Sequence, residues 1–294
     1  MGVWYTSCGE FWGREWNLQD VATTSGLVLV HCLCLLAPFH FTWGAFCVFH
    51  ILVYVTGLGI TLSYHRNLAH KSFKLPKWLE YLFAYFGVLS LQDSPIAWVS
   101  THRYHHQFTD TEKDTHSPLK GLWFSHMGWI LDSNSRFGKY GGLKNVGDLK
   151  RQPFYVFLHC TYPLHSLLLG ALLYLLGGLP FFIWGMGVRV VYVLHATLLV
   201  NSVGHMWGKQ VWKTGDLSRN NWLLGFLVLG EGWHNNHHAF EFSARQGLEW
   251  WQIDFTWYAI RLLQAIGLAR DVKSPTETQK QRKALVTRTM ASQD

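Results

Sequence analysis

Hydrophobic positions along the chain gather in four long apolar stretches, which are separated by polar segments. Crossing the hydrocarbon core of a bilayer takes roughly 20 helical residues, and each stretch is about that long. The gaps inside the first and the second pair of stretches are only three and four residues long. Short gaps of this kind predict two helical hairpins. The expected spans are residues 21–37, 41–64, 154–176 and 181–203.

The basic residues predict how these spans are oriented. None of the 25 Lys and Arg residues falls in either hairpin loop, and only Arg189 lies inside an expected span. Because positive charge is retained in the cytoplasm, both termini and the central polar segment are expected there. The sequence thus predicts an all-α integral membrane protein with four transmembrane helices. Residues 65–153 and 204–273 would form a cytoplasmic helical cap within a single domain, 1–273, followed by a polar, mobile tail at 274–294.

The composition agrees with a membrane protein. Charged residues make up 15% of the chain, whereas soluble domains carry about 25%. The net charge of +7 comes from basic residues that form no single stripe, so anionic lipid explains it better than nucleic acid does. A shorter apolar stretch, Trp78–Ser90, is expected to lie along the interface or under the cap.

Eight histidines form three boxes, HRNLAH, HRYHH and HNNHH. They are His65 and His70, then His102, His105 and His106, and finally His234, His237 and His238. In the second and third boxes the spacing i, i+3, i+4 places three imidazoles on one helix face, where they can converge on a metal. His65 and His70 differ by ~140° on an α-helix. Either they serve two different ions, or the helix ends between them.

One more ligand is expected at the cytoplasmic end of the fourth span. Asn201 and His205 are four residues apart and share a helix face. We expect His205 to bind metal and Asn201 to bind it directly or through a water. So many imidazoles exceed what one ion takes, which predicts two transition-metal ions. No cysteine cluster accompanies the boxes, which disfavours an iron–sulfur centre, and a histidine-rich di-iron centre fits best.

Four carboxylates near the boxes are candidates to hold the histidines in place. Asp93, Asp110, Asp114 and Glu231 could each accept the free N–H of a liganding imidazole, which orients the ring and raises its basicity. The alternative for each of them is a solvated surface charge. Two further histidines near the boxes, His116 and His126, are not expected to be ligands.

Taken together, HRNLAH, HRYHH, NSVGH and EGWHNNHH closely resemble the membrane-bound fatty acid desaturases with three histidine boxes, over roughly residues 37–273. The stretch NNHHAFEFSARQGLEWWQIDFTW resembles the plant and cyanobacterial Δ9-type acyl-lipid/acyl-CoA branch. This resemblance implies a di-iron cofactor, O2 as oxidant and a cis double bond introduced into a saturated acyl chain, with Δ9 as the expected position. It also implies nine ligands, with Asn201 holding a water. They are His65, His70, His102, His105, His106, His205, His234, His237 and His238.

Desaturation also requires an apolar tunnel that fixes the acyl chain beside the metals. Trp98 lies one helical turn before His102, and Thr197 lies one turn before Asn201. Both are expected to line this tunnel, with Gln92 as a further candidate. Ordinary packing behind the ligands is the alternative for these residues.

The substrate carrier and the electron donor stay open. The acyl group could be carried by coenzyme A or by a lipid, and a plastid Δ7 palmitoyl-galactolipid desaturase or a lipid hydroxylase could use the same di-iron centre. The chain has no HPGG-like haem motif, so electrons are expected from a separate cytochrome b5, or from ferredoxin in a plastid. Glu10, Glu15 and Asp20 near the N-terminus are unlike a transit peptide. The endoplasmic reticulum membrane is therefore expected, with the chloroplast membrane as the alternative.

Overall fold

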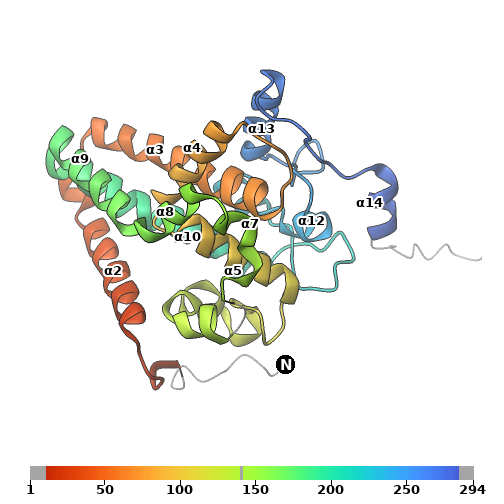
Figure 1. The fold of residues 1–294 in the computed structure, drawn as a ribbon, viewed down its shortest axis with the longest axis horizontal. Helices are drawn as coiled ribbons and strands as arrows, with labels where there is room; N and C mark the ends of the chain where they lie inside the picture. Colours follow the sequence, from red (N-terminus) through yellow and green to blue (C-terminus); the bar gives the residue numbers. More distant parts are fainter. Residues whose placement is uncertain (1–10, 140–141, 285–294) are drawn as a thin grey trace, which may run out of the picture.

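The computed structural model describes residues 11–139 and 142–284, and within those ranges the chain forms helices, loops and a few isolated β-bridges. The α-helices are α2 (Leu18–Leu35), α3 (Trp43–Leu58), α4 (Lys77–Val88), α5 (Pro95–Phe108), α6 (Leu122–His126), α7 (Gly147–Lys150), α8 (Pro153–Cys160), α9 (Tyr162–Phe182), α10 (Arg189–Ser202), α11 (Trp222–Leu227), α12 (His234–Ala239), α13 (Phe255–Ala265) and α14 (Glu277–Lys283). The 3₁₀ helices are η1 (Ala37–His40), η3 (Pro118–Lys120), η4 (Gly128–Leu131), η6 (Lys144–Val146) and η8 (Val203–His205), and the π-helices are η2 (Gly59–Ala69), η5 (Asn134–Lys139) and η7 (Ile183–Val188). Figure 1 shows α2, α3 and α9 at one end of the molecule and α12, α13 and α14 at the other.

Three continuous helices are long and apolar enough to cross a membrane: Leu18–Leu35, Trp43–Ala69 and Tyr162–His205. Large apolar side chains stand exposed along them, such as Leu29 at 67% and Leu175 at 81%. Water would penalise so much contiguous apolar surface, whereas lipid accommodates it. The all-helical, membrane-type fold expected from the sequence is therefore present.

The longest of these helices turns back on itself. Its 44 residues would extend about 66 Å at 1.5 Å per residue, which is twice the ~30 Å thickness of a hydrocarbon core. Gly177 and Gly178 have non-helical backbone angles, with φ of +64° at Gly178, a conformation that glycine adopts without strain. A Cβ on Gly170 would lie 3.1 Å from Phe182, and one on Gly185 would meet Leu173. The two halves are therefore antiparallel, as the second predicted hairpin requires.

Two of the expected span boundaries are shifted by about five residues or more. The third apolar stretch is broken at Thr161, so α8 is a separate helix and the long helix begins at Tyr162, with a proline in its first turn. Proline lacks the N–H that this position leaves unpaired and therefore favours a helix start there. The second stretch continues past its expected end at Tyr64 through η2 to Ala69. This extension carries His65 out of the apolar region toward the cap.

The cap contains more ordered structure than the sequence indicates. The short apolar stretch that was expected near the interface forms α4, which packs against α3 and η2. Within the expected tail, α14 contacts the rest of the protein, because the backbone N–H of Lys213 donates to the carbonyl of Lys283 at 2.8 Å. The Lys283 ammonium also donates to the carbonyl of Ala239 at 2.6 Å. The remainder of the expected tail, 285–294, lies outside the described residues.

Candidate metal centre

Five imidazoles form a first cluster, which consists of His65, His70, His102, His106 and His237. Their potential ligand atoms all lie within 4.8 Å of one another. The Nε2 atoms face each other, at 2.8 Å between His70 and His102, 2.9 Å between His106 and His237, and 3.1 Å between His65 and His237. The members come from η2, α5 and α12, so the cluster joins the end of the second apolar helix to the cap.

The π-helix η2 explains how His65 and His70 meet. The backbone N–H of His70 donates to the carbonyl of His65, five residues earlier, at 3.1 Å. In a π-helix this i→i+5 bond places residues five apart one above the other. The structure places both rings in one cluster, because a π-helical turn replaces the 100° rotation of the α-helix on which the two alternatives were based.

Four buried imidazoles form a second cluster, which consists of His105, His205, His234 and His238. Nε2 of His234 lies 2.9 Å from Nε2 of His205 and 3.1 Å from Nε2 of His238. Nε2 of His105 is buried and has no hydrogen-bond partner within the described part of the chain. The second cluster is thus enclosed more completely than the first.

Each HxxHH box is divided between the two clusters. On α5, His102 and His106 belong to the first cluster and His105 to the second, and on α12 the pattern is reversed. On a helix, positions i and i+4 lie ~40° apart, whereas i+3 lies ~60° to the other side of i. The spacing of each box suggested that its three imidazoles converge on a single metal, and the structure does not show this. They point to two neighbouring positions instead.

Three of the four expected carboxylates contact cluster histidines through Nδ1. The distances are 3.0 Å from His205 to Asp110, 3.0 Å from His105 to Asp114 and 2.5 Å from His65 to Glu231. Asp93 is a correction, because its carboxylate pairs with Arg136 at 2.5 Å and with no box histidine among the described residues. Asp93 precedes α5 and lies nine residues before His102, about 13 Å along a helix axis.

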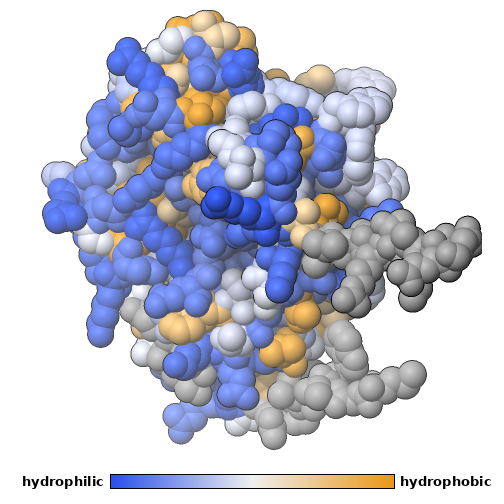
Figure 2. All heavy atoms as spheres, turned by 90° about the vertical axis from the view of Figure 1, so that its right-hand side faces the viewer, coloured by the Kyte–Doolittle hydropathy of each residue, from blue (hydrophilic) through white to orange (hydrophobic). Residues whose placement is uncertain are grey.

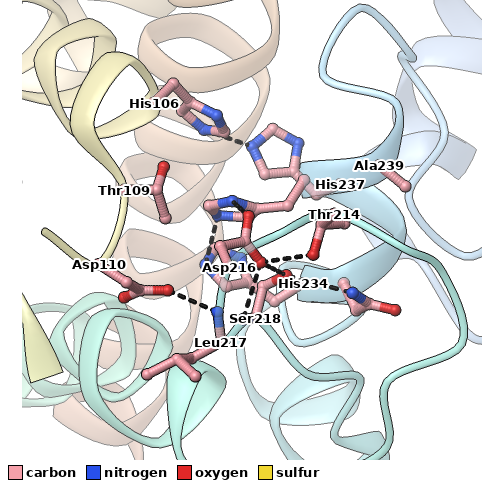
Figure 3. A network of polar contacts seen from close by, with 12 residues as sticks. His106, Thr109, Asp110, Thr214, Asp216, Leu217, Ser218, His234, His237 and Ala239 are labelled. Carbon is pink, nitrogen blue, oxygen red and sulfur yellow. Dashed lines mark hydrogen bonds and ion pairs between the residues drawn. The ribbon is translucent and has the colours of Figure 1, made fainter.

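Two carboxylates were missed from the sequence. Asp216 accepts a hydrogen bond from Nδ1 of His238 at 2.9 Å and is itself held by the hydroxyls of Thr214 and Ser218. Figure 3 shows this group, with His106 facing His237 beside it. Glu241 lies 3.6 Å from Nδ1 of His106. Asp216 lies in a loop without regular spacing, so only the tertiary structure reveals its role. Glu241 follows the third box by three residues, and this closeness is a signal that could have indicated it.

The two histidines not expected to be ligands have different surroundings. His116 is buried beside the second cluster, with its ring centroid 4.2 Å from that of His105, and it forms a group with His105 and Asp114. His126 lies outside both clusters, where its ring nitrogens contact Ser202 at 3.0 Å and His195 at 2.9 Å. His116 is therefore the additional imidazole closest to the metal-binding geometry.

The protonation states suit metal binding. Burial, followed by repulsion from neighbouring imidazoles, holds the pKa values of six of the nine cluster histidines well below their usual range. They are His70, His102, His105, His234, His237 and His238. Neutral imidazole is the form that ligates metals, and a carboxylate on Nδ1 leaves the Nε2 lone pair free. Two nitrogen ligands at ~2.1 Å from one ion lie about 3.0–3.4 Å apart, close to the Nε2 separations found here. Both clusters therefore fit a transition-metal ion.

A buried ion network holds the first cluster from behind. Arg66, fully buried, donates to Glu231 at 2.9 Å and to Asp254 at 2.9 Å. Burial opposes ionisation of Glu231, but His65 and Arg66 beside it hold the pKa of this carboxyl at about 2. Glu231 is thus a charged acceptor for the Nδ1 proton of His65. Arg66, the residue after that ligand, fixes the carboxylate in place.

The residues expected to line the tunnel are not all at one cavity. Trp98 stacks on His102, with centroids 5.0 Å apart. Thr197 lines an apolar cavity of about 210 Å³ between α3, α10 and α11, together with Ile60 and Leu229. Gln92 is buried and donates to the carbonyl of Val193 at 3.0 Å. Asn201, partly buried, lies in the last turn of α10, four residues before His205.

Long apolar helices and two imidazole clusters that could each hold a metal ion define the class of this membrane protein. The sequence model of the fatty acid desaturase family matches residues 16–269. The chain belongs to the fatty acid desaturase family.

Curated relatives extend this assignment. The chain is 62% identical to a chloroplast palmitoyl-monogalactosyldiacylglycerol delta-7 desaturase of Arabidopsis thaliana, covering 93% of this chain and 74% of that relative. It is 58% identical to delta-9 acyl-lipid desaturase 1 of the same plant, covering 94% and 90%. It is 57% identical to an icosanoyl-CoA 5-desaturase of Limnanthes douglasii, covering 92% and 77%. The predicted resemblance is confirmed, and the protein is an oxidoreductase that acts on fatty acyl chains.

Proposed function

We propose that this protein is an O2-dependent di-iron desaturase that introduces a cis double bond at Δ9 of a saturated acyl chain. The observation that carries the proposal is the pair of imidazole clusters assembled from all three histidine boxes and His205. An iron pair bound there would supply the oxidising power to remove two hydrogens from unactivated methylenes, which no side-chain acid or base can do.

Each of the two clusters would bind one of the two ions. The first cluster would hold one ion with five imidazoles, and the second would hold the other with four imidazoles and Asn201 through a water. Asp110, Asp114, Asp216 and Glu231 would orient the rings. The apolar cavity at Thr197 would receive part of the acyl chain, and Trp98, stacked on His102, would limit where the chain passes the metals.

The break at Gly177 and Gly178 supports an arrangement of four membrane crossings. With that break, the three apolar helices would provide four crossings in two hairpins. The cap would lie in the cytoplasm with both termini, in the endoplasmic reticulum membrane, and would take electrons from cytochrome b5. Membranes of the chloroplast, with ferredoxin as donor, are the alternative location.

A second regiospecificity has a specific observation in its favour. The relative that desaturates palmitoyl-galactolipid at Δ7 is 62% identical, whereas the Δ9 acyl-lipid relative is 58% identical and the 5-desaturase is 57% identical. A Δ7 palmitoyl-galactolipid desaturase is therefore the alternative candidate.

The test is to express the chain in a desaturase-deficient yeast and in a cyanobacterium that makes galactolipids and ferredoxin. Gas chromatography–mass spectrometry with double-bond derivatisation gives the position and chain length of new products. New Δ9 monoenes that vanish in a His105→Ala variant are the expected result. Δ7 hexadecenoate confined to galactolipids would select the alternative, and hydroxy acids would replace desaturation with hydroxylation. Well-expressed protein without iron in either host would refute the proposal.

A further inference from the structure

Two helices of the cap, α11 and α13, leave large apolar side chains bare. Five of these side chains are between 49% and 70% exposed, and we call them the cap face: Trp222, Phe226, Tyr258, Leu262 and Ile266. Figure 1 places α13 at the upper edge of the molecule, and hydrophobic atoms are visible at the same edge in Figure 2. Water penalises an apolar surface of this kind, which therefore marks a contact with lipid or with another protein.

The cap face is one surface because α11 and α13 are joined. The ring centroids of Phe226 and Phe255 lie 5.9 Å apart, and those of Phe255 and Tyr258 lie 6.3 Å apart. At the same junction the backbone N–H of Thr256 donates to the carbonyl of Leu229 at 3.0 Å. The exposed side chains of the two helices are therefore held next to one another by packing and by the backbone.

α13 is apolar on opposite sides. Ile260 is fully buried and packs with Trp257 and Leu263 in a hydrophobic core that includes residues of η2 and α4. Tyr258 and Leu262 point about 160° away from Ile260 around the helix axis and are exposed. A helix that is apolar all round is typical of a protein interior or of a membrane. The bare side of α13 is therefore expected to face lipid, and tyrosine favours the lipid interface.

The cap face meets the long apolar helices at the apolar cavity of about 210 Å³. Phe226 and Phe255 line this cavity from the cap, and Tyr54 of α3 and Tyr192 of α10 line it from the long helices. Three of these residues are also exposed on the outside, Tyr54 at 52%, Tyr192 at 38% and Phe226 at 53%. The cavity thus has a mouth between α3, α10 and α11.

This mouth lies beside a membrane-spanning part of the chain. The hydroxyl of Tyr192 donates to the carbonyl of Leu227 at 3.1 Å, which ties α10 to the end of α11. Tyr192 lies about 20 Å before His205 along the helix axis, at 1.5 Å per residue, inside the long helix that is apolar enough to cross a membrane. The lipid around this part of α10 therefore also reaches the cap face, and this continuity favours lipid over a protein partner.

We propose that the cap face lies in the adjacent leaflet of the bilayer, and that the mouth at Tyr54, Tyr192 and Phe226 is a lateral entrance for the acyl chains of membrane lipids. The entrance rests on the proposed function, whereas the membrane contact does not. Ile60, a buried lining residue, lies five residues before His65 in the π-helix η2, which is one hydrogen-bonded turn of such a helix. A chain that enters at the mouth would approach the first cluster without exposing its methylenes to water.

Photocrosslinking of the full-length protein in phosphatidylcholine nanodiscs tests the membrane contact. The photoreactive amino acid p-benzoylphenylalanine replaces Leu262 in one preparation and Val211 in another, and mass spectrometry identifies the adducts. Val211 is the matched control, because it is an aliphatic residue of 42% exposure in the loop that a β-bridge from Trp212 to Ala284 joins to the end of α14. The face that carries α14 is largely hydrophilic in Figure 2. Lipid adducts should form at position 262 and not at position 211.

The variant Phe226→Glu, which places a charge at the mouth, tests the entrance. Initial rates of the iron-loaded enzyme are measured with reduced cytochrome b5 or ferredoxin in excess, while the mole fraction of stearoyl-phosphatidylcholine or palmitoyl-monogalactosyldiacylglycerol in the nanodiscs is varied. The KM for the lipid should rise about tenfold, because a carboxylate in contact with the bilayer interior is costly, and kcat should stay within about twofold. Phe226→Leu should keep the wild-type KM, and Val211→Glu should change neither quantity.

Three results would overturn the inference. One is the absence of lipid adducts at position 262, and another is adducts there with a second copy of the chain, which would assign the cap face to an interface between copies. The third is an unchanged KM in Phe226→Glu, or an equal rise in Phe226→Leu, which would refute the entrance. Failure of the proposed function is recognised separately, because the wild type would then form no alkene while lipid adducts at position 262 still form.

Discussion

The two histidine clusters differ in what surrounds them. In the second cluster, three of four rings donate Nδ1–H to buried or nearly buried aspartates, namely Asp110, Asp114 and Asp216. In the first cluster, among the residues that the structure describes, only His65 has such a buried partner, Glu231, since the carboxylate that contacts His106 is 51% exposed. The second cluster is therefore held by fixed charges inside the protein, and the first opens toward solvent.

The charge balance differs as well. Arg66 compensates Glu231 behind the first cluster, whereas the three aspartates of the second cluster have no Lys or Arg ion partner among the described residues. Carboxylates that accept a ligand's N–H raise its basicity and stabilise the more positive metal. We expect the second cluster to hold its ion more tightly and the first to exchange its ion and electrons more readily. Similar sets of imidazoles can therefore be tuned differently by the carboxylates that accept hydrogen bonds from them.

The largest effect should come from removing one ligand of each cluster on the same helix. His237→Ala on α12 removes a first-cluster ring that contacts both His65 and His106, and His234→Ala removes a second-cluster ring. Each variant should lose more than about 100-fold in activity, because loss of a group that merely holds a ligand already costs 10–100-fold. Iron content should fall from about two to about one per chain in each variant. The iron that remains should give a different Mössbauer signal in His237→Ala than in His234→Ala.

His126→Ala is the control for this pair, because His126 lies outside both clusters and its loss should leave two irons. Complete loss of iron in both His234→Ala and His237→Ala would show that the two positions do not bind independently. The two clusters would then act as one binding site and not as two separate ones.

The nine histidines and the membrane class could be predicted from the sequence because each depends on local spacing. The partition of the boxes could not, since it requires the π-helical turn that joins His65 to His70 and the rotation of α5 against α12. The role of Asp216 depends on a loop that returns to His238. Asp93 lies close to the second box in sequence, but its carboxylate pairs with Arg136. Closeness in sequence does not decide where a side chain points.

A smaller effect should distinguish Asp216, which has no Lys or Arg ion partner among the described residues, from Glu231, which pairs with Arg66. Asp216→Asn and Glu231→Gln should each weaken iron retention or activity by roughly 10–100-fold. Glu231→Gln should also lower the free energy of unfolding by up to about 3 kcal/mol, because Arg66 loses one of two buried counter-charges. Asp216→Asn should leave the fold nearly as stable. Chelator competition and thermal unfolding measure the two quantities.

Asp93→Asn provides the reference for this pair, because its carboxylate contacts Arg136 and no box histidine within the described residues. Its iron retention should stay within about twofold of wild type, because the ion pair between Asp93 and Arg136 does not contact the histidines. Equal losses of fold stability in Asp216→Asn and Glu231→Gln would contradict the difference in charge balance between the clusters.

The smallest effect should come from Glu241, the carboxylate beside the first cluster that is half exposed. Its oxygen lies 3.6 Å from Nδ1 of His106, which is too long for a good hydrogen bond. Solvent-exposed pairs contribute about 0.2–1 kcal/mol, so Glu241→Gln should change iron retention less than about fivefold. Iron analysis after timed exposure to a chelator gives this ratio. A loss as large as that of Glu231→Gln would mean that Glu241 becomes buried when the metal binds, and the first cluster would then be as closed as the second.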